Sequence, residues 1–205
     1  MNRSISQYFA LLCTALFIAS IIGCTSPSKL TAPAPQAAST PPAATNLPTI
    51  RIKAGIDAPL TDSKGITWSA DTGFDGGEEV DRPDLEVVAT DCPELYHSER
   101  FSMDSYNFKV PNGDYLVKLH FSEDYDGLTD PNMRLFTYAV KDGAPNTGKT
   151  IKEVKDFSPW KAAGAQFKGY IDTVPVTVTT GQISITFTPQ VENPQINALE
   201  IVPAK

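Results

Sequence analysis

Apolar and polar residues alternate with a period of two in several segments between residues 49 and 205. The clearest are DYLVKLHF at 114–121, TVPVTV at 173–178 and QISITFT at 182–188. This period places every second side chain on one face of an extended chain, so each segment is predicted to be a half-buried β-strand. Weaker forms of the pattern predict further strands at 50–55, 94–101, 105–110, 134–141 and 196–202.

Turn signals separate the predicted strands, and one helix signal interrupts them. The segments PNG at 111–113 and TG at 180–181 are typical of tight turns. The segment 158–164 has a Ser N-cap, a Pro at the first helical position and a Gly stop, which predicts one or two helical turns. We therefore expect an all-β fold: an antiparallel jelly-roll β-sandwich with long rim loops at 69–93 and 122–133 and at most one short helix.

The N-terminal part of the chain differs in composition from the rest. Residues 1–23 combine Arg3 with an uncharged apolar run, which is typical of a signal peptide and too short to span a membrane. Gly23-Cys24 resembles the lipobox of bacterial lipoproteins, which implies cleavage before Cys24 and lipidation of that residue. The alternative is an ordinary secretory signal. Residues 24–48 contain six prolines and no aromatic residue, so they are predicted to be a disordered tether.

The predicted lipid anchor indicates an exported protein that is attached to a bacterial membrane. Two or more acyl chains on one residue anchor a protein stably, whereas a single chain binds membranes only marginally. Thr25 follows the lipidated residue, where an Asp would be associated with retention in the inner membrane. The outer membrane is therefore favoured over the inner one, and a folded domain is expected at 49–205.

The charge of the chain argues against nucleic acid as a partner. The sequence carries 17 Lys and Arg against 24 Asp and Glu, a formal net charge of −7, and Arg3 and Lys29 are the only charged residues before position 50. Nucleic-acid binding rests largely on the neutralisation of phosphates by Lys and Arg. An acidic domain of this kind is expected to bind no nucleic acid.

Familiar catalytic and metal-binding motifs are absent from the sequence. His97 and His120 are the only histidines, and His120 is expected to be an ordinary sheet residue on the face opposite the apolar set. Loop carboxylates leave glycoside hydrolysis as an alternative, and the Asp spacing at 124–130 leaves calcium binding as an alternative to a solvated acidic loop. We expect no catalytic residue, no cofactor and no metal, and we expect Cys92 to be a buried, unpaired thiol.

Three aromatic residues, Phe74, Phe101 and Tyr125, lie on polar segments rich in carboxylates. A sugar ring packs its apolar C–H face on an aromatic ring, while its hydroxyls bind carboxylates and amides. Each aromatic taken alone is better explained as core filling beneath a loop. Their joint placement raises the hypothesis of a carbohydrate site.

Five motifs together, in this order, resemble the malectin domain, a family also treated as a carbohydrate-binding module. They are RIKAG (51–55), TDSKGITWSADTGFDGG (61–77), TDCPELYHSERF (90–101), NGDYLVKLHFSEDY (112–125) and VENPQINALEIV (191–202). The resemblance implies a non-catalytic β-sandwich lectin. Its founding member recognises glucose disaccharides, which implies neutral, glucose-containing ligands for this chain.

The resemblance also implies which residues contact the sugar. The family's loop aromatics fall near Phe74, at Phe101 and at Tyr125, and its acidic sugar contact falls at Glu192. Asn193 and Asp126 are expected to assist, although Asp126 stands where the family has a second aromatic, which puts the sugar preference in doubt.

Two neighbouring pairs of residues carry expectations of their own. Gly76 and Gly77 are expected to let a ligand approach the backbone closely. Glu99 and Arg100 are expected to form ion pairs that orient the end of a strand, and contact with the ligand is the alternative.

The sequence thus predicts a membrane-anchored, non-catalytic, carbohydrate-binding lipoprotein. The alternative is a malectin-like scaffold that binds another protein of the cell envelope, motivated by the aromatic lost at Asp126 and by the absence of a catalytic domain for a carbohydrate module to serve.

Overall fold

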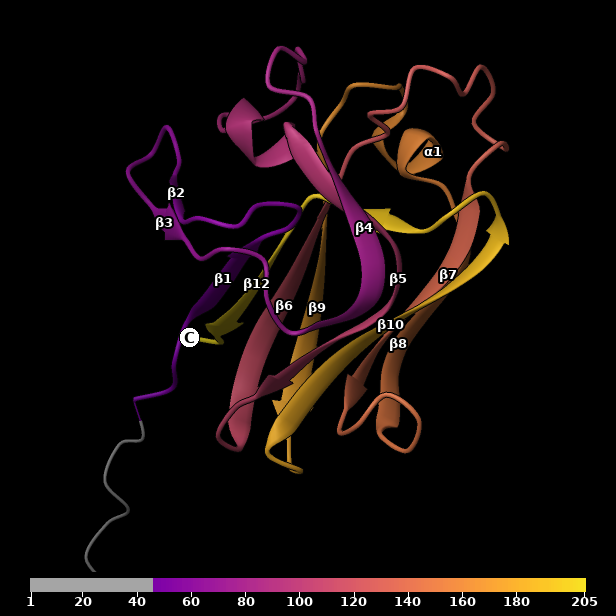
Figure 1. Cartoon of the computed structure of the whole chain (residues 1–205). Coiled ribbons are helices and arrows are strands. Elements are labelled where there is room, and N and C mark those ends of the chain that lie inside the picture. Colours follow the sequence, from indigo (N-terminus) through magenta and orange to yellow (C-terminus); the bar gives the residue numbers. More distant parts are fainter. Residues whose placement is uncertain (1–45) are drawn as a thin grey trace, which may run out of the picture. The chain divides into compact units, whose positions relative to one another are not determined.

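Two antiparallel sheets pack face to face in the structure, a computed structural model that describes residues 46–205 (Figure 1). The predicted signal peptide at 1–23, the predicted lipidation site Cys24 and the predicted tether as far as residue 45 lie outside the described residues. The all-β, jelly-roll sandwich expected from the alternating pattern is confirmed.

The first sheet has four strands. In spatial order they are β1 (Ile50–Lys53), β12 (Ala198–Pro203), β6 (Gly113–Phe121) and β9 (Tyr170–Val178). The second sheet is built on β5 (Ser98–Lys109), β10 (Gln182–Val191), β7 (Leu135–Asp142) and β8 (Lys149–Phe157). It is completed by β4 (Phe74–Asp81) and the short β11 (Gln195–Ile196), which both pair with β5.

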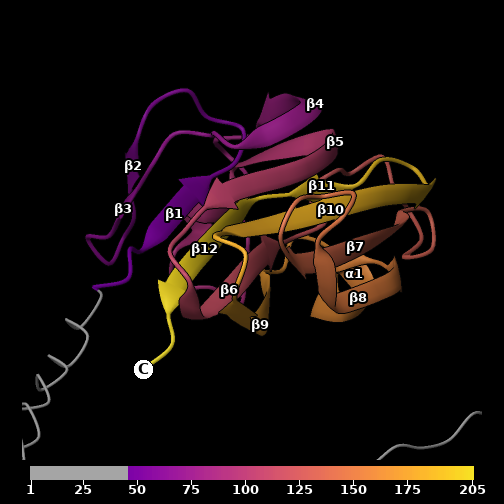
Figure 2. The ribbon, with the colours of Figure 1, turned by 90° about the horizontal axis from the view of Figure 1, so that it is seen from below.

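The main core lies between the two sheets. The apolar set of β6, Tyr115 to Phe121 at every second position, is fully buried there, because period two directs all of these side chains to one face. A smaller apolar cluster lies on the outer face of the first sheet, where the hairpin of β2 (Leu60–Thr61) and β3 (Thr67–Trp68) packs beside β1 (Figure 2). Trp68 and Cys92 belong to this cluster, and Cys92 is a free, buried thiol as predicted.

The short helix is confirmed as α1 (Pro159–Ala163). The Ser158 hydroxyl accepts a hydrogen bond from the Lys161 N–H at 3.3 Å, and Gly164 ends the helix with φ of 82°. No helix of the described residues is both long and apolar enough to cross a membrane.

The predicted strand at 94–101 is partly wrong. Residues Pro93–Tyr96 form a 3₁₀ turn, η1, in which the Leu95 N–H donates to the Cys92 carbonyl at 3.2 Å, and β5 begins only at Ser98. A proline at the start of the segment favours such a turn, because it fixes φ and has no N–H to donate to a sheet.

Besides the two-residue strands β2 and β3, two longer strands were missed. β4 lies inside the stretch expected to be a loop, and β8 carries no alternating signal; both are edge strands with mostly exposed side chains. The alternating pattern arises where one face of a strand is buried, and both of these strands are largely exposed.

Candidate functional site

A pocket of about 380 Å³ opens where the ends of β4 and β5 meet two rim loops. The loops are 122–134, which follows β6, and 192–194, which follows β10. Its lining residues are Glu79, Val80, Arg82, Glu99, Phe101, Tyr125, Arg134, Glu192 and Asn193. The fold thus brings together Phe101, Tyr125, Glu192 and Asn193 from segments as much as ninety positions apart in the sequence.

Phe74 and Asp126 do not line this pocket. Phe74 pairs with Tyr106 in the β4–β5 register, whereas the pocket residues Glu79 and Val80 lie near the other end of β4. The Phe74 ring instead lies 3.5 Å from the guanidinium carbon of Arg100. Asp126 is exposed on its loop.

The expected role of Gly76 and Gly77 is wrong. They do not line the pocket, and they follow the point between Asp75 and Gly76 at which the register of β4 against β5 shifts. Gly77 has φ of 83°, and a Cβ there would lie 2.6 Å from the Phe101 carbonyl oxygen. The glycines therefore allow β4 to follow β5 closely, which is a backbone requirement of the sheet and not of a ligand.

Glu99 and Arg100 form the ion pairs expected of them. Arg100 donates from Nε to Asp71 at 2.6 Å, and Glu99 accepts from Arg82 at 3.2 Å. Successive residues of a strand point to opposite faces, so Glu99 lines the pocket while Arg100 does not.

Tyr125 is held in place by its own loop. Its N–H approaches the Glu123 carboxylate at 3.4 Å, and its carbonyl accepts from the Gln166 amide at 2.8 Å. The ring packs over Gly127, where a Cβ would come within 2.4 Å of the Tyr125 ring carbon Cζ. The side chain is 44% exposed, so its ring is available to a ligand.

Arg134 joins the two rim loops, and sequence reasoning missed it. Its Nε donates to Glu123 at 2.7 Å, and its Nη1 donates to the Asn193 carbonyl. Burial raises the pKa of Glu123, and the Arg134 charge opposes that rise. Next to Asn193, Glu192 adopts a left-handed backbone with φ of 58°, a conformation that costs about 1 kcal/mol or more and is common at binding sites.

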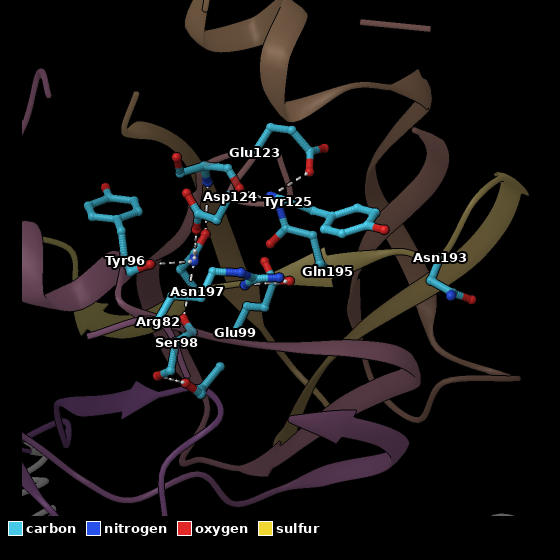
Figure 3. Close-up of polar contacts among 12 residues, drawn as sticks. Arg82, Tyr96, Ser98, Glu99, Glu123, Asp124, Tyr125, Asn193, Gln195 and Asn197 are labelled. Carbon is cyan, nitrogen blue, oxygen red and sulfur yellow. Dashed lines mark hydrogen bonds and ion pairs between the residues drawn. The ribbon is translucent and has the colours of Figure 1, made fainter. Parts of the chain in front are cut away.

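A cluster of buried polar side chains lies behind the pocket (Figure 3). At its centre the Asn197 amide donates to Asp124 at 2.7 Å and to the Ser98 carbonyl at 3.1 Å, while its oxygen accepts from the Ser122 N–H at 2.8 Å. Burial, reinforced by the negative charge of Glu99, raises the pKa of Asp124 to about 7. Asn197 thereby fixes the start of the 122–134 loop against the start of β5.

Lys53 completes this cluster from β1. Its ammonium is fully buried and donates to the carbonyls of Ser98, Ala54 and Asn197 at 2.7, 2.8 and 3.0 Å. Burial lowers the pKa of Lys53 to about 7, although Asp124 and other nearby carboxylates act in the opposite direction. The cluster is thus a scaffold for the loops.

The expected calcium alternative finds no support in the 124–130 loop. Asp124 is buried on Asn197, whereas Asp130 accepts from the Asn132 N–H at 2.7 Å on the surface. Among residues 46–205, the group of three potential metal ligands is Asp62, Cys92 and Glu94, away from this loop. Both oxygens of Asp62 already accept hydrogen bonds, from two backbone N–H groups and from Trp68.

The pocket offers the two kinds of contact that a sugar ring uses. Phe101 and Tyr125 supply aromatic surface, while the carboxylate of Glu192 and the amide of Asn193 supply an acceptor and a donor. The sequence profile of the malectin domain family matches residues 49–199. The chain belongs to the malectin domain family. Malectin domains are carbohydrate-binding modules that are not usually catalytic.

One curated relative shares sequence with part of this malectin domain. It is the kinesin-like protein KIN-14E of Oryza sativa subsp. japonica, which is 34% identical over 80 residues. The match spans 38% of this chain but only 7% of the kinesin-like protein, so the remainder of that protein has no counterpart here.

Solved structures share the fold of this malectin domain. A β-glucuronidase 2 of Bacteroides uniformis superposes with a TM-score of 0.62 at 19% identity, covering 77% of this chain and 18% of the enzyme. The plant receptor-like kinase FER gives 0.60 at 23% identity, covering 77% and 42%, and the ANXUR1 extracellular domain of Arabidopsis thaliana gives 0.60 at 16%, covering 74% and 47%. At these identities the likeness establishes the fold alone.

Proposed function

We propose that this malectin domain binds neutral, glucose-containing oligosaccharides in the pocket lined by Phe101, Tyr125, Glu192 and Asn193, without changing them chemically. The observation that carries the proposal is the convergence of these four residues on one pocket in a chain of this family. Aromatic faces beside a carboxylate can hold a sugar ring, which stacks on the aromatic surface and forms hydrogen bonds at its edge.

The charges of the pocket support a neutral ligand. Both arginines that line it are already paired, Arg82 with Glu99 and Arg134 with Glu123. Glu192 has no ion-pair partner among the described residues, and its Oε1 accepts a hydrogen bond from the Asn193 amide at 3.1 Å. An anionic sugar would meet this uncompensated negative charge, whereas a sugar hydroxyl donates to it.

We further propose that Cys24 carries a lipid anchor and that residues 24–48 tether the domain at 49–205 to a bacterial membrane, the outer membrane in preference to the inner. The proposal rests on the signal-like segment, the Gly-Cys junction and the proline-rich composition of the sequence. The domain would then capture glycans near the surface that carries it.

Titration of the purified protein with maltose, nigerose and other neutral glycans, followed by ligand-observed NMR, tests the binding proposal. Phe101→Ala and Glu192→Gln are each expected to weaken binding roughly tenfold, because one removes a stacking face and the other a charged acceptor. Phe74→Ala is the matched control, because Phe74 lies off the pocket, and it should leave affinity unchanged. Equal losses in all three variants would place the site elsewhere.

A second candidate function is a scaffold that binds a protein of the cell envelope. It is favoured by Asp126, which is exposed where the family has a second aromatic residue. A blank glycan panel, together with crosslinking of Tyr125 to an envelope protein in cells, would support this function over the first.

A further inference from the structure

A second and larger cavity lies on the outer face of the first sheet and shares no lining residue with the pocket described above. Its volume is about 780 Å³, within the range of roughly 300–1,000 Å³ typical of small-molecule sites. Its floor is formed by β1, β12, β6 and β9, and its walls by the β2–β3 hairpin and the segment 89–92.

The floor carries a row of charges across three neighbouring strands. Arg51 of β1 pairs in register with Glu200 of β12, which pairs with Lys118 of β6. The Glu200 carboxylate accepts from Arg51 at 2.9 Å and from Lys118 at 3.3 Å, and His120 lies 3.4 Å from the same carboxylate. Two cations thus share one carboxylate.

The walls are held by contacts of their own. Trp68 donates from its indole N–H to Asp62 at 2.9 Å, and its ring meets the His120 ring edge-on with centroids 5.4 Å apart. On the other wall, the Val88 N–H donates to the Phe167 carbonyl at 2.9 Å, and Gly169 donates back to Val88 at 3.0 Å. The cavity is therefore preformed by backbone and side-chain hydrogen bonds.

A count of charges in the cavity indicates what it would bind. The Lys64 and Asp91 charges cancel in an ion pair of 2.8 Å, and Asp62 is fully used by Trp68 and backbone N–H groups. Asp62 keeps its negative charge, so across the whole lining three Lys and Arg side chains balance three carboxylates. On the floor itself, Arg51 and Lys118 face the single Glu200, which leaves a local excess of one positive charge there. Among the described residues only Nε of Arg51 has a partner, so its terminal N–H groups remain available.

From this geometry we propose that the cavity is a binding site for a small organic anion of about monosaccharide size. Its carboxylate or phosphate group contacts Arg51 and Lys118, and its body lies against Trp68 and Ile66 on the hairpin wall. Guanidinium and ammonium groups are the usual partners of such oxyanions. This site stands independently of the carbohydrate pocket, because no residue is common to both.

The two tryptophans of the chain provide the test. Trp68 lines the cavity, whereas Trp160 belongs to helix α1 and does not line the cavity. In ¹⁵N-labelled protein that lacks only residues 1–23, glucuronate and glucose 6-phosphate are titrated against glucose as the uncharged match. We expect one or both anions to shift the Trp68 indole resonance saturably and to leave Trp160 unmoved, and we expect glucose to shift neither.

Variants test the charges themselves. Arg51→Gln and Lys118→Gln should each weaken anion binding about tenfold, and added salt should weaken it further. Glu200→Gln should strengthen it, because the competing carboxylate is lost. Lys155→Gln removes an equal charge from an exposed side chain of β8 and should change nothing.

Three results would overturn the proposal. They are an unmoved Trp68 resonance with both anions, an equal response to glucose, or affinities indifferent to Arg51→Gln and Lys118→Gln. Glu200→Gln is expected to raise the affinity for the anion and Lys118→Gln to lower it. Either variant therefore tests the proposal even if the other folds poorly.

Discussion

At the scale of single residues, the carbohydrate pocket depends on one glycine as much as on the residues that line it. Gly127 does not touch the ligand site, yet the Tyr125 ring occupies the space that a Cβ on Gly127 would take. The backbone of Gly127 does not have positive φ, so alanine is tolerated there by the main chain. A change at this position therefore acts on the aromatic ring and not on the loop backbone.

We predict that Gly127→Ala weakens sugar binding about fivefold to tenfold, which corresponds to roughly 1–1.4 kcal/mol, because the displaced Tyr125 ring loses its stacking position. Melting temperature should change little. Thr129→Ala, in the same exposed loop, is the control. Glycan titrations of both variants measure the effect, and unchanged affinity in Gly127→Ala would show that the Tyr125 ring makes no sugar contact.

Asn197 is the second residue on which the pocket depends, through hydrogen bonds alone. We predict that Asn197→Ala lowers the free energy of unfolding by about 2–4 kcal/mol, because the Ser122 N–H and the Asp124 carboxylate are both left buried without a partner. Urea denaturation measures this loss. Asn132→Ala, at an exposed amide of the same loop, should cost much less; equal costs would mean that the buried amide does not anchor the loop.

At the scale of elements, the charge row of β1, β12 and β6 ties the first sheet together across its outer face. Burial alone would raise the pKa of Glu200, but the hydrogen bond with His120, the charge of Lys118 and the hydrogen bond from Arg51 together lower it to about 2. A carboxyl whose pKa is depressed in the folded state stabilises the fold while it is ionised. That stabilisation is complete above the unfolded pKa of 4.5 and is lost as the pH falls toward about 2.

The lowered pKa of Glu200 gives a pH-dependent prediction. Glu200→Gln should cost roughly 2–3 kcal/mol of unfolding free energy at neutral pH, and the cost should fade between pH 4.5 and about 2. Denaturant titrations of both proteins at pH 7 and pH 3 measure the difference. A cost that is the same at both values would mean that the loss comes from packing and not from charge.

Whether a strand can be predicted from the sequence depends on how its side chains are buried. β6, β9 and β10 were predicted because each buries alternate side chains against the core. The edge strand β4 was not predicted, and Arg82, just beyond its end, was missed with it. Arg134 was missed for a different reason: a lone arginine beside a strand has no pattern, and only its contacts with Glu123 and Asn193 reveal its role.

At the scale of the whole molecule, the rim pocket and the cavity on the outer face of the first sheet differ in character. The rim pocket has its cations paired and suits a neutral ring, whereas the cavity on the outer face of the first sheet has a local excess of positive charge on its floor. The proposed anchor and tether would present both to the same surroundings. Binding at either is expected to be independent of the lipid.

We predict that Cys24→Ala releases the protein from the membrane fraction without changing its affinity for glycans. Fractionation of cells, with mass spectrometry of the N-terminal peptide, measures anchoring. Cys92→Ala is the matched control, because Cys92 is buried in the domain and has no role in anchoring. Membrane retention of Cys24→Ala would overturn the proposed lipidation site.

The sequence by itself determined the class of fold, the short helix and the family. These conclusions rest on local features: the alternating pattern of the strands, the Ser158 and Gly164 caps and the motifs in their order. Local features can be recognised in the sequence without the structure. The family resemblance nominated Phe101, Tyr125 and Glu192, Asn193 was expected to assist them, and the fold places all four on one pocket.

Only the tertiary structure decided which side chains meet. Phe74 lies off the pocket because the β4–β5 register, with its shift between Asp75 and Gly76, places it opposite Tyr106. The charge row of Arg51, Glu200 and Lys118 joins positions up to 149 residues apart in the chain. These contacts depend on strand pairing and loop closure between residues far apart in the sequence, and no local pattern of polarity encodes them.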